Sequence, residues 1–194
     1  MSDSNPSRLV ILDRDGVINE DSDNYIKSVE EWIPIPGSIE AIASLTRAGF
    51  TVAVATNQSG LARGYFDELA LARMHGLMYD LVETAGGTVN ALAYCPHAPD
   101  DGCRCRKPGP GLLEQLQVEL GMPVQGAWYV GDTEKDIDTA LGHHCRPILV
   151  LTGKGADTLK KLTDSKKNQT VIVSNLQSAV SFILNEYHKG QDPV

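Results

Sequence analysis

The chain has 194 residues, with 17 Lys and Arg against 25 Asp and Glu, so its formal net charge is −8. A nucleic-acid-binding protein usually carries a basic face, and this balance therefore argues against a nucleic-acid partner. No apolar run approaches the roughly 18 residues that a membrane-spanning helix needs, and residues 1–8 are polar and lack the apolar stretch of a secretion signal. We expect a cytoplasmic monomer without membrane contact, with one domain over residues 1–194 and flexible ends at 1–8 and 189–194.

Short β-rich runs alternate with helical segments along the chain. The predicted strands are residues 9–12, 51–56, 91–94, 127–130, 147–151 and 171–173. The predicted helices are residues 38–48, 67–85, 112–120, 134–141 and 176–188. The lysine-rich stretch 160–167 is interpreted as a solvated helix end and loop. Unbroken apolar strands that alternate with helices predict an α/β fold, an open parallel sheet with helices on both faces.

Polar clusters follow three of the predicted strands. Residues 13–16 (Asp-Arg-Asp-Gly) follow the first strand, residues 56–60 (Thr-Asn-Gln-Ser-Gly) end the second, and residues 131–133 (Gly-Asp-Thr) follow the fourth. Ligands of open α/β sheets bind at the carboxyl ends of the strands, beside a switch point in the strand order. The sequence therefore predicts one site, at that edge of the sheet.

The residue types in these clusters suit phosphoryl transfer. Asp13 and Asp15, joined by Asp132, offer the oxygen ligands that Mg²⁺ prefers. Thr56 offers a hydroxyl and Lys107 a positive charge, and both would stabilise charge on phosphoryl oxygens. An isolated Asp-x-Asp is usually a turn or a helix start, but the joint occurrence of these groups, in order and after strands, favours a phosphatase.

Four segments together resemble the haloacid-dehalogenase-like phosphohydrolases. They are Asp13-Arg14-Asp15-Gly16-Val17, Thr56-Asn57, Lys107-Pro108 and Gly131-Asp132-x-x-x-Asp136, within a match over residues 10–155. The resemblance implies a Rossmann-like fold and a Mg²⁺-dependent reaction. The gaps between the motifs are too short for a separate cap domain, so loops must shape the pocket.

The same resemblance implies a role for each motif residue. Asp13 attacks phosphorus and binds Mg²⁺. Asp15 protonates the leaving alcohol, then acts as base for the hydrolytic water, and lends its backbone carbonyl to the metal. The phosphoryl group is held by Thr56 and Lys107. Asp132 completes the metal site, and Asp136 lies one layer further out, where it orients ligands or waters.

A second metal site is predicted in the loop before Lys107. Its ligands are three thiols and one imidazole, from Cys95, His97, Cys103 and Cys105. Such a set suits a closed, tetrahedral structural Zn²⁺ site, and the alternative is a reduced loop with free thiols. Zinc would pin the loop and hold the two cations that follow it over the phosphate pocket. Cys145 is expected to pack between a helix and a strand.

The zinc loop makes the chain similar to a zinc-containing subgroup of the family. This resemblance implies one of two substrates, a heptose 1,7-bisphosphate that loses its 7-phosphate in lipopolysaccharide biosynthesis, or histidinol phosphate. The segment 151–155 (Leu-Thr-Gly-Lys-Gly) and the stand-alone chain favour the small phosphorylated sugar. The residues expected to contact substrate are Asn57, Gln58, Ser59, Arg63, Arg106 and Thr133.

Three alternatives stay open on the sequence alone. Glu20, Asp21 and Asp23 could hold the amine and imidazole of histidinol phosphate. Polynucleotide 3′-ends are a further candidate substrate, against which the net charge and the zinc loop both count. The remaining alternative comes from another class, a non-enzymatic, zinc-stapled binding module whose carboxylates are only surface groups.

Overall fold

Six parallel strands form one sheet in the computed structural model, which describes residues 7–189. The strands are β1 (Leu9–Leu12), β2 (Thr51–Asn57), β3 (Ala91–Cys95), β4 (Trp128–Gly131), β5 (Arg146–Val150) and β6 (Val171–Val173). Their order across the sheet is β3-β2-β1-β4-β5-β6, and every neighbouring pair is parallel. The chain moves outward from β1 to β3 and then resumes on the other side of β1, which makes the β1–β4 junction the switch point.

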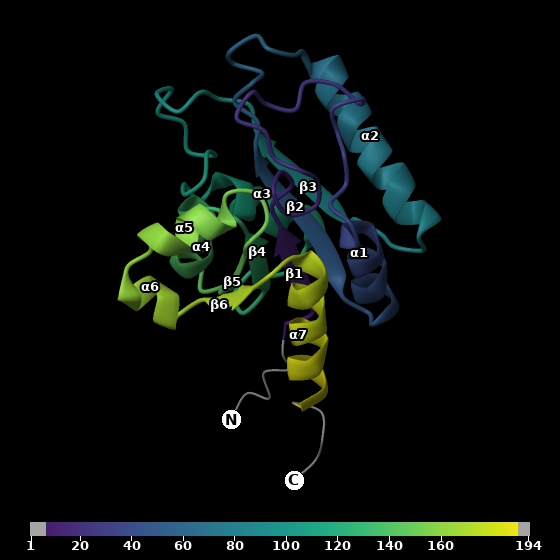
Figure 1. Cartoon of the computed structure of the whole chain (residues 1–194), viewed down its shortest axis with the longest axis vertical. Helices are drawn as coiled ribbons and strands as arrows, with labels where there is room; N and C mark the ends of the chain where they lie inside the picture. The colour runs from purple at the N-terminus through teal and green to yellow at the C-terminus, as the bar shows by residue number, and fades with distance from the viewer. Residues whose placement is uncertain (1–6, 190–194) are drawn as a thin grey trace.

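Helices cover both faces of this sheet (Figure 1). They are α1 (Ser38–Arg47), α2 (Glu68–Thr84), α3 (Gly111–Leu120), α4 (Glu134–Gly142), α5 (Gly155–Lys161), α6 (Asp164–Asn168) and α7 (Leu176–Lys189). Alternate residues of β1 serve the two faces. Val10 and Leu12 pack in the core under α1, α2 and α7, whereas Leu9 and Ile11 pack in the core under α3. The predicted open α/β sheet is confirmed.

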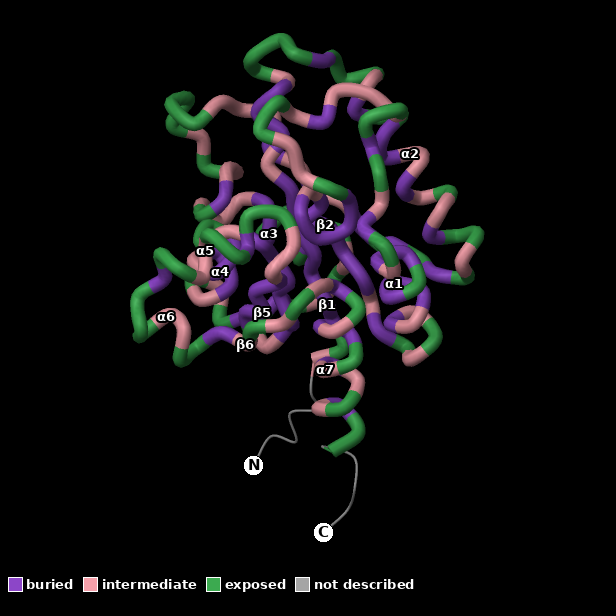
Figure 2. Tube along the Cα trace, in the orientation of Figure 1, coloured by how far each residue is buried: buried purple, intermediate pink, exposed green. Residues whose placement is uncertain are grey.

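The core lies on the strands themselves. All four residues of β1 and all four of β4 are buried, and Figure 2 shows buried backbone running through the centre of the molecule. Parallel strands covered on both faces have no solvent side, so they carry apolar residues without alternation. None of the described helices is long and apolar enough to cross a membrane.

The lysine-rich stretch 160–167 differs from its prediction as a helix end and loop. It holds the end of α5 and also the start of a separate helix, α6. Leu162 lies between the two helices, and its side chain turns inward and packs with Ile137 and Leu149. Thr163 then caps α6 by accepting a hydrogen bond from the Lys166 amide. A single buried leucine thus divides what the charge pattern presents as one solvated segment.

The predicted flexible ends lie partly outside the described residues, which exclude 1–6 and 190–194. Of the described part, the Arg8 guanidinium stands over the Tyr187 ring at 4.8 Å. The Arg8 carbonyl also accepts a hydrogen bond of 2.8 Å from the Thr51 amide at the start of β2. Both contacts attach the chain before β1 to the sheet and α7.

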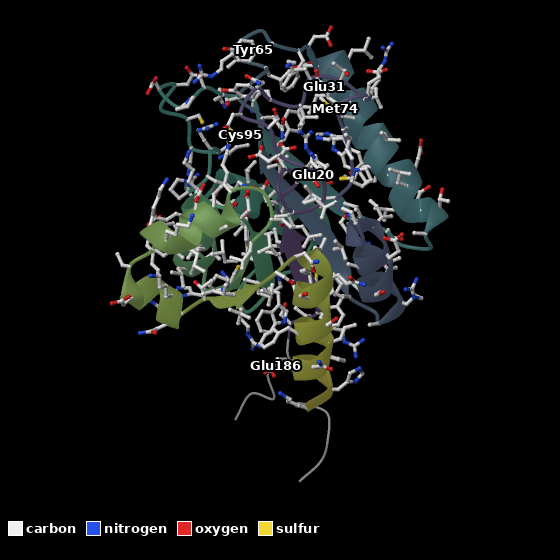
Figure 3. All side chains as sticks on the ribbon, in the orientation of Figure 1. Glu20, Glu31, Tyr65, Met74, Cys95 and Glu186 are labelled. Atoms are coloured by element: carbon white, nitrogen blue, oxygen red, sulfur yellow. The ribbon has the colours of Figure 1, made fainter. Side chains whose placement is uncertain are left out.

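The strand register brings the polar clusters to one edge. Leu12 at the end of β1 pairs with Val54 of β2 and with Val130 of β4. The Asp13 amide continues this pairing and donates to the Val130 carbonyl at 2.9 Å. In Figure 3, Cys95 at the end of β3 and Glu20 in the loop after β1 lie toward this edge, far from Glu186 near the end of α7.

Candidate active site

A polar cavity of about 260 Å³ opens at the carboxyl edge of the sheet. Most of the predicted site residues line it, namely Asp13, Asp15, Thr56, Asn57, Gln58, Ser59, Arg106, Lys107, Asp132 and Thr133. Asp136 is buried behind them. Arg63 is exposed in the loop after β2 and is not among the lining residues. Two cations of the lining, Lys135 and Lys154, were not predicted.

Lys107 joins two carboxylates at the bottom of the cavity. Its ammonium lies 2.8 Å from Asp13 Oδ2 and 2.7 Å from Asp136 Oδ1, and it donates to the Ala55 carbonyl at 2.8 Å. Burial opposes the charge of this lysine, but the two carboxylates outweigh burial and raise its pKa well above the ordinary value. Lys107 is therefore a fixed cation beside the predicted nucleophile.

Asp13, Asp132 and Asp136 gather their carboxylates at one point, with an oxygen of each within 4.8 Å of the others. Burial first, and then the charge of Lys107 and the neighbouring carboxylates, set the pKa of Asp13, which is raised to about 7. Burial and repulsion by Asp136 and Asp13 raise the pKa of Asp132 to about 8. Buried carboxylates that repel one another in this way fit a site for a divalent cation.

The two oxygens of Asp136 are already bound by protein donors. Oδ1 accepts a hydrogen bond from the Lys107 ammonium. Oδ2 accepts hydrogen bonds from the Thr133 amide at 3.0 Å and from the Thr133 hydroxyl at 2.6 Å. This capping box at the start of α4 fixes Asp136 at the rear of the site. Asp13 and Asp132 line the cavity and Asp136 does not, so these two carboxylates are the ones that face the place where a metal would bind.

Asp15 is held as a carboxylate by three side chains. Its Oδ1 accepts from Arg14 Nε at 3.0 Å and from Asn19 Nδ2 at 2.8 Å, and its Oδ2 accepts from Gln58 Nε2 at 2.9 Å. Burial opposes the charge of Asp15, but the Arg14 charge and these hydrogen bonds outweigh burial and lower its pKa. The side chain is present in the form that a general base needs.

Some of the predicted substrate contacts bind other site residues. Gln58 Nε2 bridges from Asp15 to Thr56 Oγ1, at 2.9 Å from each. Asn57 brackets the backbone of Lys107, where its Oδ1 accepts from the amide at 3.0 Å and its Nδ2 donates to the carbonyl at 3.3 Å. These amides hold the catalytic candidates in place from the cavity wall.

Gly16 makes the close approach between two loops possible. Its φ is +79°, and a Cβ there would collide with the Asp132 carboxylate. Gly153 faces it from the loop after β5, with Thr152 Oγ1 donating to the Gly16 carbonyl at 2.6 Å. The Lys154 amide then donates to Asp132 Oδ2 at 2.7 Å. Glycine at position 16 is therefore required for Asp132 to reach the site.

Three cations besides Lys107 line the cavity, and they are Arg106, Lys135 and Lys154. Arg106 and Lys135 lie on its rim, and burial and the charge of Arg106 lower the pKa of Lys135. Lys154 is paired across the mouth, 3.1 Å from Asp21 and 3.5 Å from Asp23. Mutual repulsion between Lys135 and Arg106 marks a position where an anion would be stabilised.

The predicted zinc ligands converge on one point beside the cavity. The ligand atoms of Cys95, His97, Cys103 and Cys105 all lie within 4.8 Å of one another. Cys105 Sγ is 3.2 Å from both Cys95 Sγ and His97 Nδ1, which is the crowding expected around a single ion. Arg106 follows directly and donates to the His97 carbonyl at 3.2 Å, so this loop positions the rim cation.

Comparisons with known proteins show the family of the chain. A family model for HAD-hydrolase-like proteins matches residues 104–179. A D-glycero-beta-D-manno-heptose-1,7-bisphosphate 7-phosphatase from Pseudomonas aeruginosa is 54% identical over 176 residues, 91% of this chain and 97% of the relative. The chain belongs to the haloacid-dehalogenase-like hydrolase family. A relative of the same name from Neisseria meningitidis serogroup A is 45% identical, over 92% of this chain and 96% of its own.

Solved structures of this haloacid-dehalogenase-like family share the fold. The D,D-heptose 1,7-bisphosphate phosphatase from B. bronchiseptica, complexed with magnesium and phosphate, matches with a TM-score of 0.86 at 45% identity. The match covers 92% of this chain and 98% of that one. The phosphatase of the same description from Burkholderia thailandensis matches with a TM-score of 0.69 at 34% identity, over 91% and 97% of the two chains. The predicted fold and family are confirmed.

Sequence reasoning missed parts of this haloacid-dehalogenase-like site. Lys135 is the second residue of α4, where a Glu-Lys pair looks like an ordinary exposed helix start. Only the position of α4 at the carboxyl edge directs this lysine to the cavity. The Asp-x-Asp pattern predicts no role for Arg14, although its side chain is fully buried and binds Asp15. An arginine that binds the neighbouring aspartate from a buried position has no characteristic spacing in the sequence.

Proposed function

We propose that this protein is a Mg²⁺-dependent phosphatase that removes the 7-phosphate of D-glycero-β-D-manno-heptose 1,7-bisphosphate. The observation that carries the proposal is the buried ion pair between Asp13, the proposed nucleophile, and Lys107. It lies in a chain that is 54% identical to a phosphatase named for this activity. With this substrate, the reaction would belong to the pathway that supplies nucleotide-activated heptose for lipopolysaccharide. The cytoplasmic, monomeric state stays a prediction.

The residues of the site divide the reaction between them. Asp13 attacks phosphorus while the bond from phosphorus to the sugar oxygen breaks. Lys107 and the Thr56 hydroxyl stabilise charge on the phosphoryl oxygens. Asp15, present as a carboxylate, takes a proton from the water that then releases phosphate from Asp13. To protonate the leaving sugar oxygen, Asp15 must first take up a proton.

The carboxylates that line the cavity indicate where magnesium would bind. We assign it to the carboxylates of Asp13 and Asp132 and to the backbone carbonyl of Asp15, with Asp136 holding Lys107 behind them. Magnesium bound there supplies Lewis-acid stabilisation of the phosphoryl oxygens and relieves repulsion between the acids. Its oxygen ligands distinguish it from the sulfur-rich site that we assign to zinc.

The rim cations suit the phosphate that does not react. Arg106 is placed by the Cys-His loop and Lys135 by the start of α4, and both line the cavity. Ser59 and Thr133 complete the polar wall, and the exposed Arg63 would reach only a substrate that extends beyond it. A bisphosphate uses both rim cations, whereas histidinol phosphate brings a cation of its own to this place.

Replacing Arg106 by alanine should lower kcat/KM for the bisphosphate by about tenfold or more, because a hydrogen bond to a charged group is worth about 1.5–3 kcal/mol. Lys135→Ala should act in the same direction. Heptose 7-phosphate, which lacks the second phosphate, should be affected much less by either change. An equal loss for both substrates would contradict the assignment. Lys160→Ala, on an exposed part of α5, is the matched control.

The two metals should be separable. EDTA should stop phosphate release at once and added Mg²⁺ should restore it, whereas zinc held by thiolates should leave slowly and lower the melting temperature. Metal analysis of the purified protein should find about one zinc per chain. Cys103→Ser should reduce both the zinc content and the melting temperature, and Cys145→Ser should leave the zinc content unchanged. Fully active protein without zinc would overturn the zinc proposal.

A comparison of substrates tests the proposed function. We expect a higher kcat/KM for the heptose bisphosphate than for histidinol phosphate, with phosphate release as the readout. The reverse order would favour the histidinol-phosphate alternative and leave the phosphatase mechanism standing. No Mg²⁺-dependent hydrolysis of either substrate or of an aryl phosphate would favour a zinc-stapled binding module instead.

A further inference from the structure

Arg14 carries a buried positive charge whose hydrogen bonds all serve the site. Its side chain is 0% exposed. Its Nη2 lies 2.9 and 3.0 Å from the two oxygens of Asp15 and donates to Gln58 Oε1 at 3.2 Å. Its Nη1 lies 3.2 Å from His75 Nε2. A guanidinium removed from water is stable only when its N–H groups have partners, so each contact constrains its orientation.

His75 contacts this guanidinium from a different element of the fold. It lies on α2, 61 residues from Arg14 in sequence, and is buried at 7% exposure. The labelled side chain before it, Met74, marks this part of α2 in Figure 3. Because arginine has donors only, His75 Nε2 must be the acceptor, which fixes the neutral form with the proton on Nδ1. Burial and the Arg14 charge also lower the pKa of His75 to about 3.

We infer that His75 is a positioning residue for the phosphatase reaction, acting through Arg14 to fix the Asp15 carboxylate. The inference rests on the proposed function and adds a residue that no motif of the sequence contains. Without the acceptor on α2, the guanidinium keeps its charge but loses one of the contacts that orient it. Asp15 keeps its hydrogen bonds to Asn19 and Gln58 but loses the fixed position of its Arg14 partner.

The step most affected is the release of phosphate from Asp13. A water oxygen forms a bond to phosphorus while the bond from phosphorus to Asp13 breaks. One proton of the water goes to Asp15 and from there to solvent, and the other stays on the phosphate. Misplacing Asp15 slows this proton transfer. Formation of the phosphorylated enzyme from an ester with a good leaving group needs no acid and should continue.

The test uses 4-nitrophenyl phosphate, whose leaving group needs no protonation, together with the heptose bisphosphate. His75→Leu removes the acceptor and keeps an apolar side chain. His75→Gln places an oxygen near the position of Nε2, and His75→Asn is too short to reach Arg14. Met78→Leu, a volume-conserving change at a fully buried position of the same helix, is the packing control.

We expect His75→Leu and His75→Asn to lower kcat about tenfold or more, with KM within about threefold, since a hydrogen bond to a charged group is lost. With 4-nitrophenyl phosphate they should give a burst of about one nitrophenolate per chain before a slow steady state. His75→Gln should restore kcat to within about threefold and remove the burst. Met78→Leu should behave as the wild type.

Two results would overturn the inference. One is a folded His75→Leu or His75→Asn protein with kcat within about twofold of the wild type and no burst. The other is an equal loss in His75→Gln and Met78→Leu, which would make the effect one of packing. Should leucine prevent folding, the asparagine and glutamine variants decide between these outcomes. Because the burst is measured with an aryl phosphate, a wrong choice of sugar substrate would leave this test unaffected.

Discussion

Replacing Asp13 by asparagine should leave less than about 1% of the phosphatase activity, because loss of a covalent nucleophile normally costs several powers of ten. An amide does not attack phosphorus and binds Mg²⁺ poorly. The fold should survive. Asparagine keeps an oxygen for the Arg14 amide, which donates to Asp13 Oδ1 at 2.7 Å. Burial already disfavours the charge of Asp13, as its raised pKa of about 7 shows.

Acid quenching during turnover of labelled substrate gives the second readout of this change. The wild-type protein should carry label as an acid-stable but base-labile adduct, and Asp13→Asn should carry none. Asp80→Asn, an exposed carboxylate on α2, is the matched control and should keep both the activity and the adduct. Retention of a labelled adduct in Asp13→Asn would move the nucleophile to another residue.

Replacing Lys107 by methionine should affect catalysis and stability together. The change leaves Asp13, Asp136 and the Ala55 carbonyl without the donor they now share, at 2.7–2.8 Å. Removing one partner of a buried ion pair costs about 3–5 kcal/mol of unfolding free energy. Loss of the cation that faces the phosphoryl group should lower kcat by about a hundredfold or more. Urea unfolding and steady-state kinetics measure the two effects.

A double variant separates the two contributions of Lys107. Lys107→Met with Asp136→Asn removes the buried cation and one of its two carboxylate partners, so it should recover part of the stability and none of the activity. Lys160→Met, at an exposed position of α5, should change neither. A stable but inactive double variant would identify Lys107 as a catalytic cation, and activity within tenfold of the wild type in the single variant would contradict that role.

Much of the fold could be predicted because its strands are buried on both faces. The run Leu9–Leu12 has no polar position to confuse the pattern, and the same is true of residues 52–55 in β2. The predicted ends of α1 and α3 lie close to the observed ends, since a glycine follows each helix. The second helix in the lysine-rich stretch could not be predicted, because only tertiary packing turns Leu162 inward.

The candidate site was predictable to the extent that its residues follow strands. The site contains Asp13 directly after β1, Thr56 near the end of β2 and Asp132 directly after β4. Parallel pairing of these strands is enough to bring the three residues together. Lys135 and His75 lie within helices, where a single cation or histidine has no distinguishing pattern. Arg63 is a different case, because its substrate contact stays a prediction while its side chain lies exposed on the loop and is not among the lining residues. Side-chain direction in loops depends on packing that the sequence does not display.

The central claim is that one phosphate, at one carbon of one sugar, is transferred to Asp13 and released. Phosphorus NMR of the reaction with D-glycero-β-D-manno-heptose 1,7-bisphosphate and Mg²⁺ tests it most directly. The C7 phosphate resonance should be replaced by inorganic phosphate at equal intensity, while the C1 phosphate resonance stays. Loss of the C1 phosphate first, or loss of both phosphates at similar rates, would contradict the claim.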